Sequence, residues 1–229
     1  MRIVSWNCCG KAVNTRLEEL ASLQADIVCL QECRDDSTQE KLRHRTLAGS
    51  VVSSQRTPSK GIAIWVKDDY SIAQATTRLS VPHHVRATIT KYGSFNAIGV
   101  WTHKEPTYPK CLKTVLEAYP DISQTPTVVL GDFNSHPQFD KNNRSYTHND
   151  LVADLNALGL VSAYHHFHRC KAGDESHPTY FHQRKQHQPF HLDYCFIPQA
   201  WAHNIESVTV PGFDEFATSD HRPLIVDLA

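Results

Sequence analysis

The stretch TVVLGDFNSHP, residues 127–137, joins an apolar run to a polar turn. Residues 127–130 suit a buried strand, and Asp132 and Asn134 follow directly after Gly131. Residues two apart in an extended backbone point to the same side, so the acid and the amide are predicted to face one point. A strand that simply ended at the surface would not need this pair. The stretch therefore predicts a polar site at the end of a buried strand.

Four other apolar segments carry polar side chains in the same way. Burying an unpaired carboxylate is costly or raises its pKa, so acids in such places usually meet a cation or a hydrogen-bond donor. Each residue taken alone is better explained as a structural cap or a satisfied core group, but five segments together favour one shared site. The additional residues are Asn7 at the end of RIVSWN, Glu32 at the end of DIVCLQE, Asp193 in HLDYCFIP, and Asp220 and His221 in TSDHRPLIVDL.

The types of side chain narrow the chemistry. Carboxylate and amide oxygens are hard ligands that suit Mg²⁺ or Mn²⁺, whereas a zinc site would need clustered His or Cys ligands at these strand ends. His221 adds a group that titrates near neutrality and can be held by a carboxylate. A metal, a carboxylate and an imidazole together can hydrolyse a phosphoester.

The ordered motifs SWN, LQE, VVLGDFN, HLDY and SDHRP resemble those of the endonuclease/exonuclease/phosphatase superfamily, which has the DNase I-like fold. The resemblance extends from Asn7 to His221, nearly the whole chain. It implies an α+β protein: a four-layer α/β/β/α sandwich of two packed mixed sheets flanked by helices. The site would lie at one edge of the two sheets, and residues 1–229 would form a single domain.

The resemblance also implies a role for each matching residue. One set would bind Mg²⁺ or Mn²⁺, and a second set would act on water and phosphate. Glu32 would be the principal metal ligand with Asn7 and Asp220 nearby, Asp132 would orient or deprotonate the attacking water, Asn134 would hold the phosphate, and His221 would contact the scissile phosphate with Asp193 fixing its tautomer and charge.

His103 ends the apolar run IGVWTH. Many members of the superfamily that act on varied phosphodiesters have His there, so the resemblance implies a second residue that binds substrate and stabilises the transition state. An ordinary strand-end histidine is the alternative. The abasic-site endonuclease branch usually has Tyr at this position and a small polar residue in place of Cys9, so both positions argue against a dedicated abasic endonuclease. Cys8 and Cys9 are expected to pack, since water is the nucleophile.

Periodicity predicts three helices and eight strands. The helices are predicted at 14–24, with Thr15 and Glu18 as a capping box, at 110–119 and at 149–159. Several strands are apolar almost continuously, which is typical of strands buried on both faces. The strands are predicted at Arg2–Trp6, Asp26–Leu30, Gly61–Val66, Val85–Thr90, Asn96–Trp101, Thr127–Leu130, His191–Ile197 and Leu224–Leu228.

Composition sets limits on the function. The 229 residues have a formal net charge of −1, so no global basic field indicates a protein that coats nucleic acid. Seven cysteines with no CxxC pair indicate reduced thiols and a cytoplasmic location. No stretch resembles a membrane span or a signal peptide, and a monomer is expected.

Several polar segments are assigned no function. Residues 169–188 are predicted to be a surface loop or a hairpin tip, and the His-rich residues 163–170 a solvated loop. The basic run 183–188 is predicted to be a solvated face, with contact to a nucleic-acid backbone as the alternative. Arg34 and Arg86 fit either a phosphate contact or a surface ion pair.

The leading hypothesis is a metal-dependent phosphodiesterase, with DNA as the favoured substrate of an endonuclease or exonuclease. A phosphatase or phosphodiesterase that acts on a small-molecule or lipid phosphate is the second hypothesis. A non-catalytic binding module on the same fold is the third, and the complete set of acids and histidines argues against it.

Overall fold

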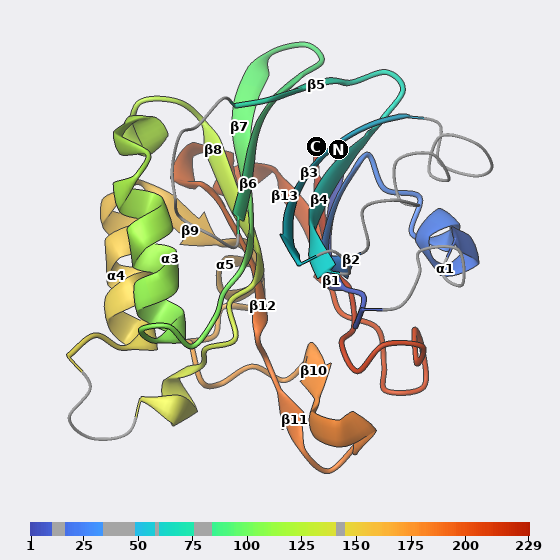
Figure 1. The fold of residues 1–229 in the computed structure, drawn as a ribbon, viewed down its shortest axis with the longest axis vertical. Helices are drawn as coiled ribbons and strands as arrows, with labels where there is room; N and C mark the ends of the chain where they lie inside the picture. Colours follow the sequence, from blue (N-terminus) through green and yellow to red (C-terminus); the bar gives the residue numbers. More distant parts are fainter. Residues whose placement is uncertain (11–16, 34–48, 58–59, 76–83, 141–144) are drawn as a thin grey trace.

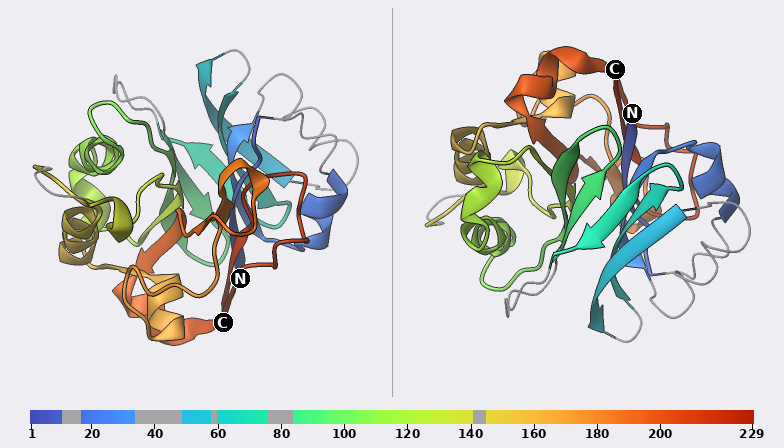
Figure 2. Two further views of the ribbon diagram at one scale, coloured as in Figure 1. Left: turned by 90° about the horizontal axis from the view of Figure 1, so that it is seen from below. Right: turned by 90° about the horizontal axis from the view of Figure 1, so that it is seen from above.

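The computed structural model describes residues 1–10, 17–33, 49–57, 60–75, 84–140 and 145–229. The predicted helix cap Thr15 and the predicted phosphate contact Arg34 lie outside these ranges. Two six-stranded mixed sheets form the centre of the structure, with helices on their outer faces (Figures 1 and 2).

The first sheet has the order β13-β14-β1-β2-β4-β3, and the second has the order β5-β6-β7-β8-β12-β9. Strands β1 and β2 run parallel, as do β7 and β8, while the other neighbours are antiparallel. The first sheet comprises β13 (Ile205–Thr209), β14 (Leu224–Leu228), β1 (Arg2–Asn7), β2 (Ile27–Cys33), β4 (Lys60–Lys67) and β3 (Gly49–Thr57). The second comprises β5 (Ser71–Gln74), β6 (His84–Thr90), β7 (Ser94–Trp101), β8 (Thr127–Asp132), β12 (Asp193–Pro198) and β9 (Leu160–Ser162).

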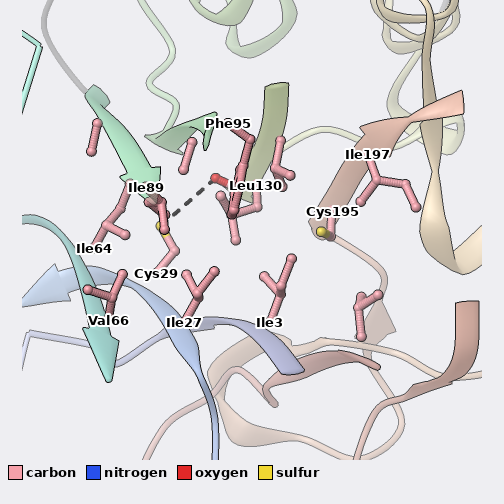
Figure 3. Packing of buried hydrophobic residues seen from close by; sticks show 14 of the residues in the cluster. Ile3, Ile27, Cys29, Ile64, Val66, Ile89, Phe95, Leu130, Cys195 and Ile197 are labelled. Atoms are coloured by element: carbon pink, nitrogen blue, oxygen red, sulfur yellow. Dashed lines mark hydrogen bonds between the residues drawn. The ribbon is translucent and has the colours of Figure 1, made fainter. Parts of the chain in front are cut away.

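The inner faces of the two sheets pack against each other to form the main core. Ile3, Ile27 and Cys29 from the first sheet meet Leu130 and Cys195 from the second, as Figure 3 shows. Each residue of the set is at most 1% exposed, so the middle of the interface between the sheets is fully buried. This packing stabilises the fold by removing apolar surface from water.

Helices cover the outer faces. Helix α1 (Leu17–Ser22) packs over the first sheet, in a cluster with Val4 and Val28. Helices α3 (Tyr108–Glu117) and α4 (His148–Ala157) pack over the second sheet. Since the central strands are buried on both sides, their sequences are apolar without alternation. The four-layer α/β/β/α arrangement predicted from the sequence is confirmed.

Local sequence explains where α3 and α4 begin. The side chain of Thr107 accepts a hydrogen bond from the Lys110 backbone at 3.4 Å, and Pro109 occupies the first turn of α3. Thr147 and Asp150 form a capping box at the start of α4. Gly159, with a φ of +78°, follows α4 in the left-handed conformation that glycine adopts readily.

All eight predicted strands are present in the two six-stranded sheets, with small shifts at their ends, but four further strands of these sheets were missed. The missed strands are β3, β5, β9 and β13, and each lies at an edge of its sheet. Edge strands are half-solvated, short or polar, so they lack the apolar run that marks a central strand. Position in the sheet therefore explains the omission.

The prediction of a solvated loop at residues 163–170 is wrong. Residues Ala163–His168 form helix α5, which Tyr164 anchors with a fully buried ring. The three histidines of this helix obscure its apolar periodicity. Its end at Arg169 adopts a φ of +54°.

The prediction of a hairpin tip within residues 169–188 is confirmed. Strands β10 (Tyr180–Phe181) and β11 (Pro189–Phe190) form a small hairpin that projects beyond the two sheets in Figure 1. Short 3-10 turns complete the described structure at Pro120–Ser123, Pro137–Phe139, His182–Arg184 and Gln199–Asn204. Across the described ranges, no helix is long and apolar enough to cross a membrane.

Candidate active site

The predicted site residues come from strands of both sheets. Asn7 and Glu32 lie on β1 and β2, while Asp132 and Asp193 lie at the end of β8 and the start of β12. In the antiparallel register Asp132 pairs directly with Asp193. His221 follows in the segment before β14 and forms a bridge to Tyr180 of the hairpin. The acids and the imidazole therefore gather at one edge of the sandwich.

Asn7 links the sheets at this edge. Its fully buried Nδ2 donates to Asp132 Oδ2 at 2.9 Å and to Glu32 Oε1 at 3.2 Å. Its Oδ1 accepts from the backbone of Cys9 at 2.9 Å, and its carbonyl accepts from Ser219 Oγ at 2.7 Å. One amide thus fixes two carboxylates from different sheets.

Two of the side chains are aimed by unusual backbone conformations. Glu32 has a φ of +56° and lies at a break in the register between β2 and β4, where a bulge turns the side chain out of the ladder. Asn134 has a φ of +47°, a conformation that asparagine tolerates better than most residues. Its backbone N–H and its Nδ2 both donate to Asp132, each at 2.9 Å.

Gly131 allows β8 to run close to β7. It has a φ of +143°, and a Cβ there would lie 2.0 Å from the carbonyl oxygen of Val100. No other residue fits without moving one of the strands that carry the site. The glycine of the GDFN motif is therefore a steric requirement of the site.

Asp193 holds His221. The Oδ2 atom of Asp193 lies 2.8 Å from His221 Nδ1, so the other ring nitrogen, Nε2, points towards Asp132 at 4.0 Å. The ring of Tyr180 packs against the imidazole at 4.6 Å. This arrangement holds the orientation of the imidazole, with Nδ1 facing Asp193 and Nε2 facing Asp132.

Burial and charge act on these groups in opposite directions. Burial disfavours the His221 imidazolium, but the carboxylates of Asp193 and Asp132 outweigh it and raise the pKa of His221 to about 9. Burial also raises the pKa of Asp132 above its ordinary value, although the attraction of His221 opposes the shift. At neutral pH the imidazole is therefore a cation within a set of acids.

The other two predicted residues lie beside this centre. His103 follows β7, with its ring 4.4 Å from that of Trp101. The adjacent Thr102 donates its backbone N–H to the Asp132 carbonyl at 3.0 Å, and its own carbonyl accepts from Asn134 Nδ2 at 3.3 Å. Asp220 is half-buried and hydrogen-bonds to Cys9. Burial, followed by Asp220, raises the pKa of the Cys9 thiol, so the thiol is protonated and a poor nucleophile.

Arg86 does not act at this centre. Its guanidinium pairs with Asp121 at 3.0 Å through Nη1, which agrees with the ion-pair interpretation. All seven cysteines are free thiols.

Sequence reasoning missed Lys60. Its ammonium contacts Glu32 Oε2 at the centre of the site. The residue opens the apolar segment KGIAIWV, and its neighbour Gly61 starts the predicted strand. The signal that could have identified Lys60 is a basic residue at the start of a central strand.

A histidine network behind Asn134 was also missed. Glu175 accepts from His165 Nε2 at 2.8 Å and from His136 Nε2 at 3.0 Å, with its side chain only 2% exposed. Ser135 Oγ lies 2.9 Å from His148 Nδ1. His165, which was expected in a solvated loop, is therefore packed and hydrogen-bonded, whereas its neighbour His166 is exposed.

The donor set fits a divalent cation. Ligand atoms of Asp132, Asp193 and His221 all lie within 4.8 Å of one another. Asp193 Oδ1 is buried and lacks a hydrogen-bond partner among the described residues. A buried carboxylate oxygen in this state needs a cation or a donor. With Glu32 and Asp220 alongside, hard oxygen atoms dominate, as Mg²⁺ and Mn²⁺ prefer.

Comparison with solved structures shows the DNase I-like fold. A 3′ phosphatase, NExo, from Neisseria, bound to a product DNA hairpin, is 18% identical, with a TM-score of 0.71 over 100% of this chain and 99% of that chain. The endonuclease domain of TRAS1, a telomere-specific non-LTR retrotransposon, is 17% identical, with a TM-score of 0.70 over 99% and 97%. A humanized D. rerio TDP2 is 17% identical, with a TM-score of 0.67 over 99% and 97%.

A search of curated proteins found no match. The model of the Endonuclease/Exonuclease/phosphatase family matches residues 4–221, which include every residue discussed at the site. The chain therefore belongs to the Endonuclease/Exonuclease/phosphatase family.

Proposed function

We propose that the protein is a divalent-metal-dependent phosphodiesterase that cleaves DNA by attack of water. The observation that carries the proposal is the relation between His221 and two acids. Asp193 holds one nitrogen of the imidazole at 2.8 Å, and the other nitrogen faces Asp132 at 4.0 Å. A cation and a carboxylate facing a common point can serve the two sides of a phosphoryl transfer.

Glu32 and Asp220, with Asn7 alongside, would hold Mg²⁺ or Mn²⁺. A bound divalent cation supplies positive charge that stabilises the phosphoryl oxygens in the transition state. The hydrogen bond from Asn7 Nδ2 to Glu32 Oε1 at 3.2 Å supports this set, because it fixes the Glu32 carboxylate beside the amide. Mg²⁺ and Mn²⁺ suit the same oxygen donors, so the cleavage assay requires both metals.

The chain's own groups would handle water and phosphate. Asp132 would orient the attacking water and accept its proton, which its raised pKa favours. His221, positively charged at neutral pH, would donate a hydrogen bond to a phosphoryl oxygen. Asn134 and His103 would hold the phosphate. Thr102, which directly precedes His103, hydrogen-bonds to both Asp132 and Asn134 and so keeps the two segments together.

DNA is the favoured substrate for two reasons. The tip of the β10–β11 hairpin carries Arg184 and Lys185, and Tyr180 of the same hairpin packs on His221, so the basic tip lies on the element next to the imidazole. A nucleic-acid backbone is an appropriate partner for such a tip. The second reason is the similarity to NExo, a different protein whose solved structure is bound to a product DNA hairpin.

The test is cleavage of labelled single-stranded, duplex and abasic DNA in Mg²⁺, in Mn²⁺ and in EDTA. The proposal predicts cutting that requires metal and is lost in His221→Ala. No cutting of any DNA, with metal-dependent hydrolysis of a simple phosphodiester or monoester, would overturn the DNA assignment and move the substrate to a small molecule or lipid.

A further inference from the structure

Lys60 pairs with the proposed principal metal ligand. Its Nζ contacts Glu32 Oε2, while Asn7 donates to the other oxygen of the same carboxylate. The Lys60 side chain is 42% exposed and that of Glu32 is 18% exposed. A partly exposed cation of the protein thus contacts the carboxylate that a divalent cation would need.

The position of Lys60 in the fold places its ammonium at the site. Lys60 begins β4, whose next residue, Gly61, pairs with Cys33 across the bulge at Glu32. The side chain crosses the turn after β1, where a Cβ on Gly10 would lie 2.8 Å from Lys60 Cε. A Cβ there would displace the end of the lysine chain, and the φ of +65° at Gly10 is a conformation that glycine adopts readily.

The same ammonium is close to the predicted phosphate-binding side of the site. Its Nζ lies 5.8 Å from the centre of the Trp101 ring, against which the ring of His103 packs at 4.4 Å. Rotation of the flexible lysine chain away from Glu32 would keep the ammonium within the same group of residues. Lysine has three donors that suit phosphate as a point charge.

A partly exposed ion pair is weak, so this contact is exchangeable. A divalent cation on Glu32 would repel the ammonium, and a phosphate that bridges to the metal would attract it. The two events are then linked through one side chain.

We infer that Lys60 is a positioning residue that couples metal binding to phosphate binding: it neutralises Glu32 before the metal binds, is displaced by the metal and then contacts the substrate phosphate. This inference rests on the proposed function. It predicts effects of opposite sign when Lys60 is removed. Metal should bind more tightly because its competitor is gone, and phosphate should bind more weakly because a donor is gone.

The experiment is calorimetric titration of the whole chain, wild type and Lys60→Met, first with Mn²⁺ alone and then with inorganic phosphate on the Mn²⁺-loaded protein. Lys60→Met should bind Mn²⁺ at least about fivefold more tightly and phosphate at least about fivefold more weakly, the lower end of typical coupling between sites. The matched control is Lys67→Met, at the exposed opposite end of β4, which should match wild type in both titrations.

Any result other than these two opposite shifts overturns the inference. Weaker binding of both ligands would show that Lys60 only supports the structure, and unchanged binding would show that the ion pair has no role. Glu32→Gln separates this from the proposed function. If wild type binds no Mn²⁺, or Glu32→Gln binds it equally well, the proposed metal site is wrong; if those controls behave, only the role of Lys60 is in question.

Discussion

Asn7 Nδ2 lies 2.9 Å from Asp132 Oδ2, so one buried amide from the first sheet holds the acid at the end of the second. The same nitrogen reaches Glu32 at 3.2 Å. The relative position of the proposed metal ligand and the proposed base therefore depends on Asn7. The two sheets do not merely pack at this edge; they are joined there by hydrogen bonds.

Replacing this amide should damage activity more than stability. Asn7→Ala is expected to lower kcat/KM by at least about 100-fold, a typical loss when an oriented donor is removed from an active site. The free energy of unfolding should fall by about 1–3 kcal/mol, since buried carboxylate oxygens lose a donor. Steady-state kinetics and urea unfolding measure the two effects.

The control is Asn96→Ala, which removes another buried amide, on β7, whose Oδ1 accepts from Thr88 at 3.1 Å. This variant should lose comparable stability and keep near-normal kcat/KM. Equal loss of activity in the two variants would mean that Asn7 acts only through stability.

The charge of His221 should make stability depend on pH. Its pKa rises from 6.5 to about 9 on folding, so the folded state gains stability that is fully present below pH 6.5 and is lost as the pH rises towards 9. His221→Asn should remove this dependence. Melting temperatures of the metal-free proteins from pH 6 to 9.5 measure this pH dependence. For a chain of this size, a change of 1 kcal/mol in stability shifts the melting temperature by roughly 2–4 °C.

The difference between wild type and His221→Asn should therefore shrink with rising pH. Groups remote from His221 titrate alike in both proteins and cancel in the comparison, whereas Asp132 loses the attraction of His221 in the variant and its pKa rises further. Parallel curves for the two proteins would refute the raised pKa.

Gly131 should tolerate no side chain. Gly131→Ala places a Cβ 2.0 Å from the Val100 carbonyl oxygen, so β7 and β8 must separate. We expect a loss of about 3 kcal/mol or more in the free energy of unfolding, the range that marks strain at a special backbone position. Chemical unfolding followed by circular dichroism measures the loss.

Gly93→Ala is the matched control, because a Cβ there meets nothing within 4 Å. Its free energy of unfolding should differ from wild type by less than about 0.5 kcal/mol, as is usual for surface changes. Similar losses for the two variants would contradict the steric explanation of the GDFN glycine.

Glu175 should be required as a carboxylate. His136 and the Gly173 backbone both donate to Oε2, at 3.0 and 2.9 Å, so a glutamine amide at that position would face two donors. Glu175→Gln should lower the free energy of unfolding at pH 7 by about 1–3 kcal/mol. The exposed neighbour Asp174→Asn should leave it unchanged. A stable Glu175→Gln protein would show that the network does not need the charge.

The central part of the fold could be predicted because strands that are buried on both faces have mostly apolar sequences. Strands such as β1 and β8 are apolar over most of their length, and polar residues at their ends indicated the edge where the site lies. Asp132, Asp193 and His221 were grouped correctly in space. Their catalytic roles remain predictions.

The remainder depends on contacts that no local pattern records. The edge strand β3 has a polar sequence, and the histidines of α5 interrupt the apolar periodicity that would indicate a helix. Lys60 reaches Glu32 only because of the bulge in β2, and Glu175 gathers His136 and His165 from distant segments. These relations are set by tertiary structure.

The most direct test of the central claim is metal-dependent hydrolysis of labelled DNA by wild type and Asp193→Asn, with substrate in excess and with Mg²⁺ or Mn²⁺ present. Asparagine keeps the shape but removes the charge that holds His221 as a cation. We expect metal-dependent cutting by wild type and a fall in kcat of about 10²–10⁴-fold in the variant, the range for loss of acid–base catalysis. Turnover by Asp193→Asn at the wild-type rate would contradict it.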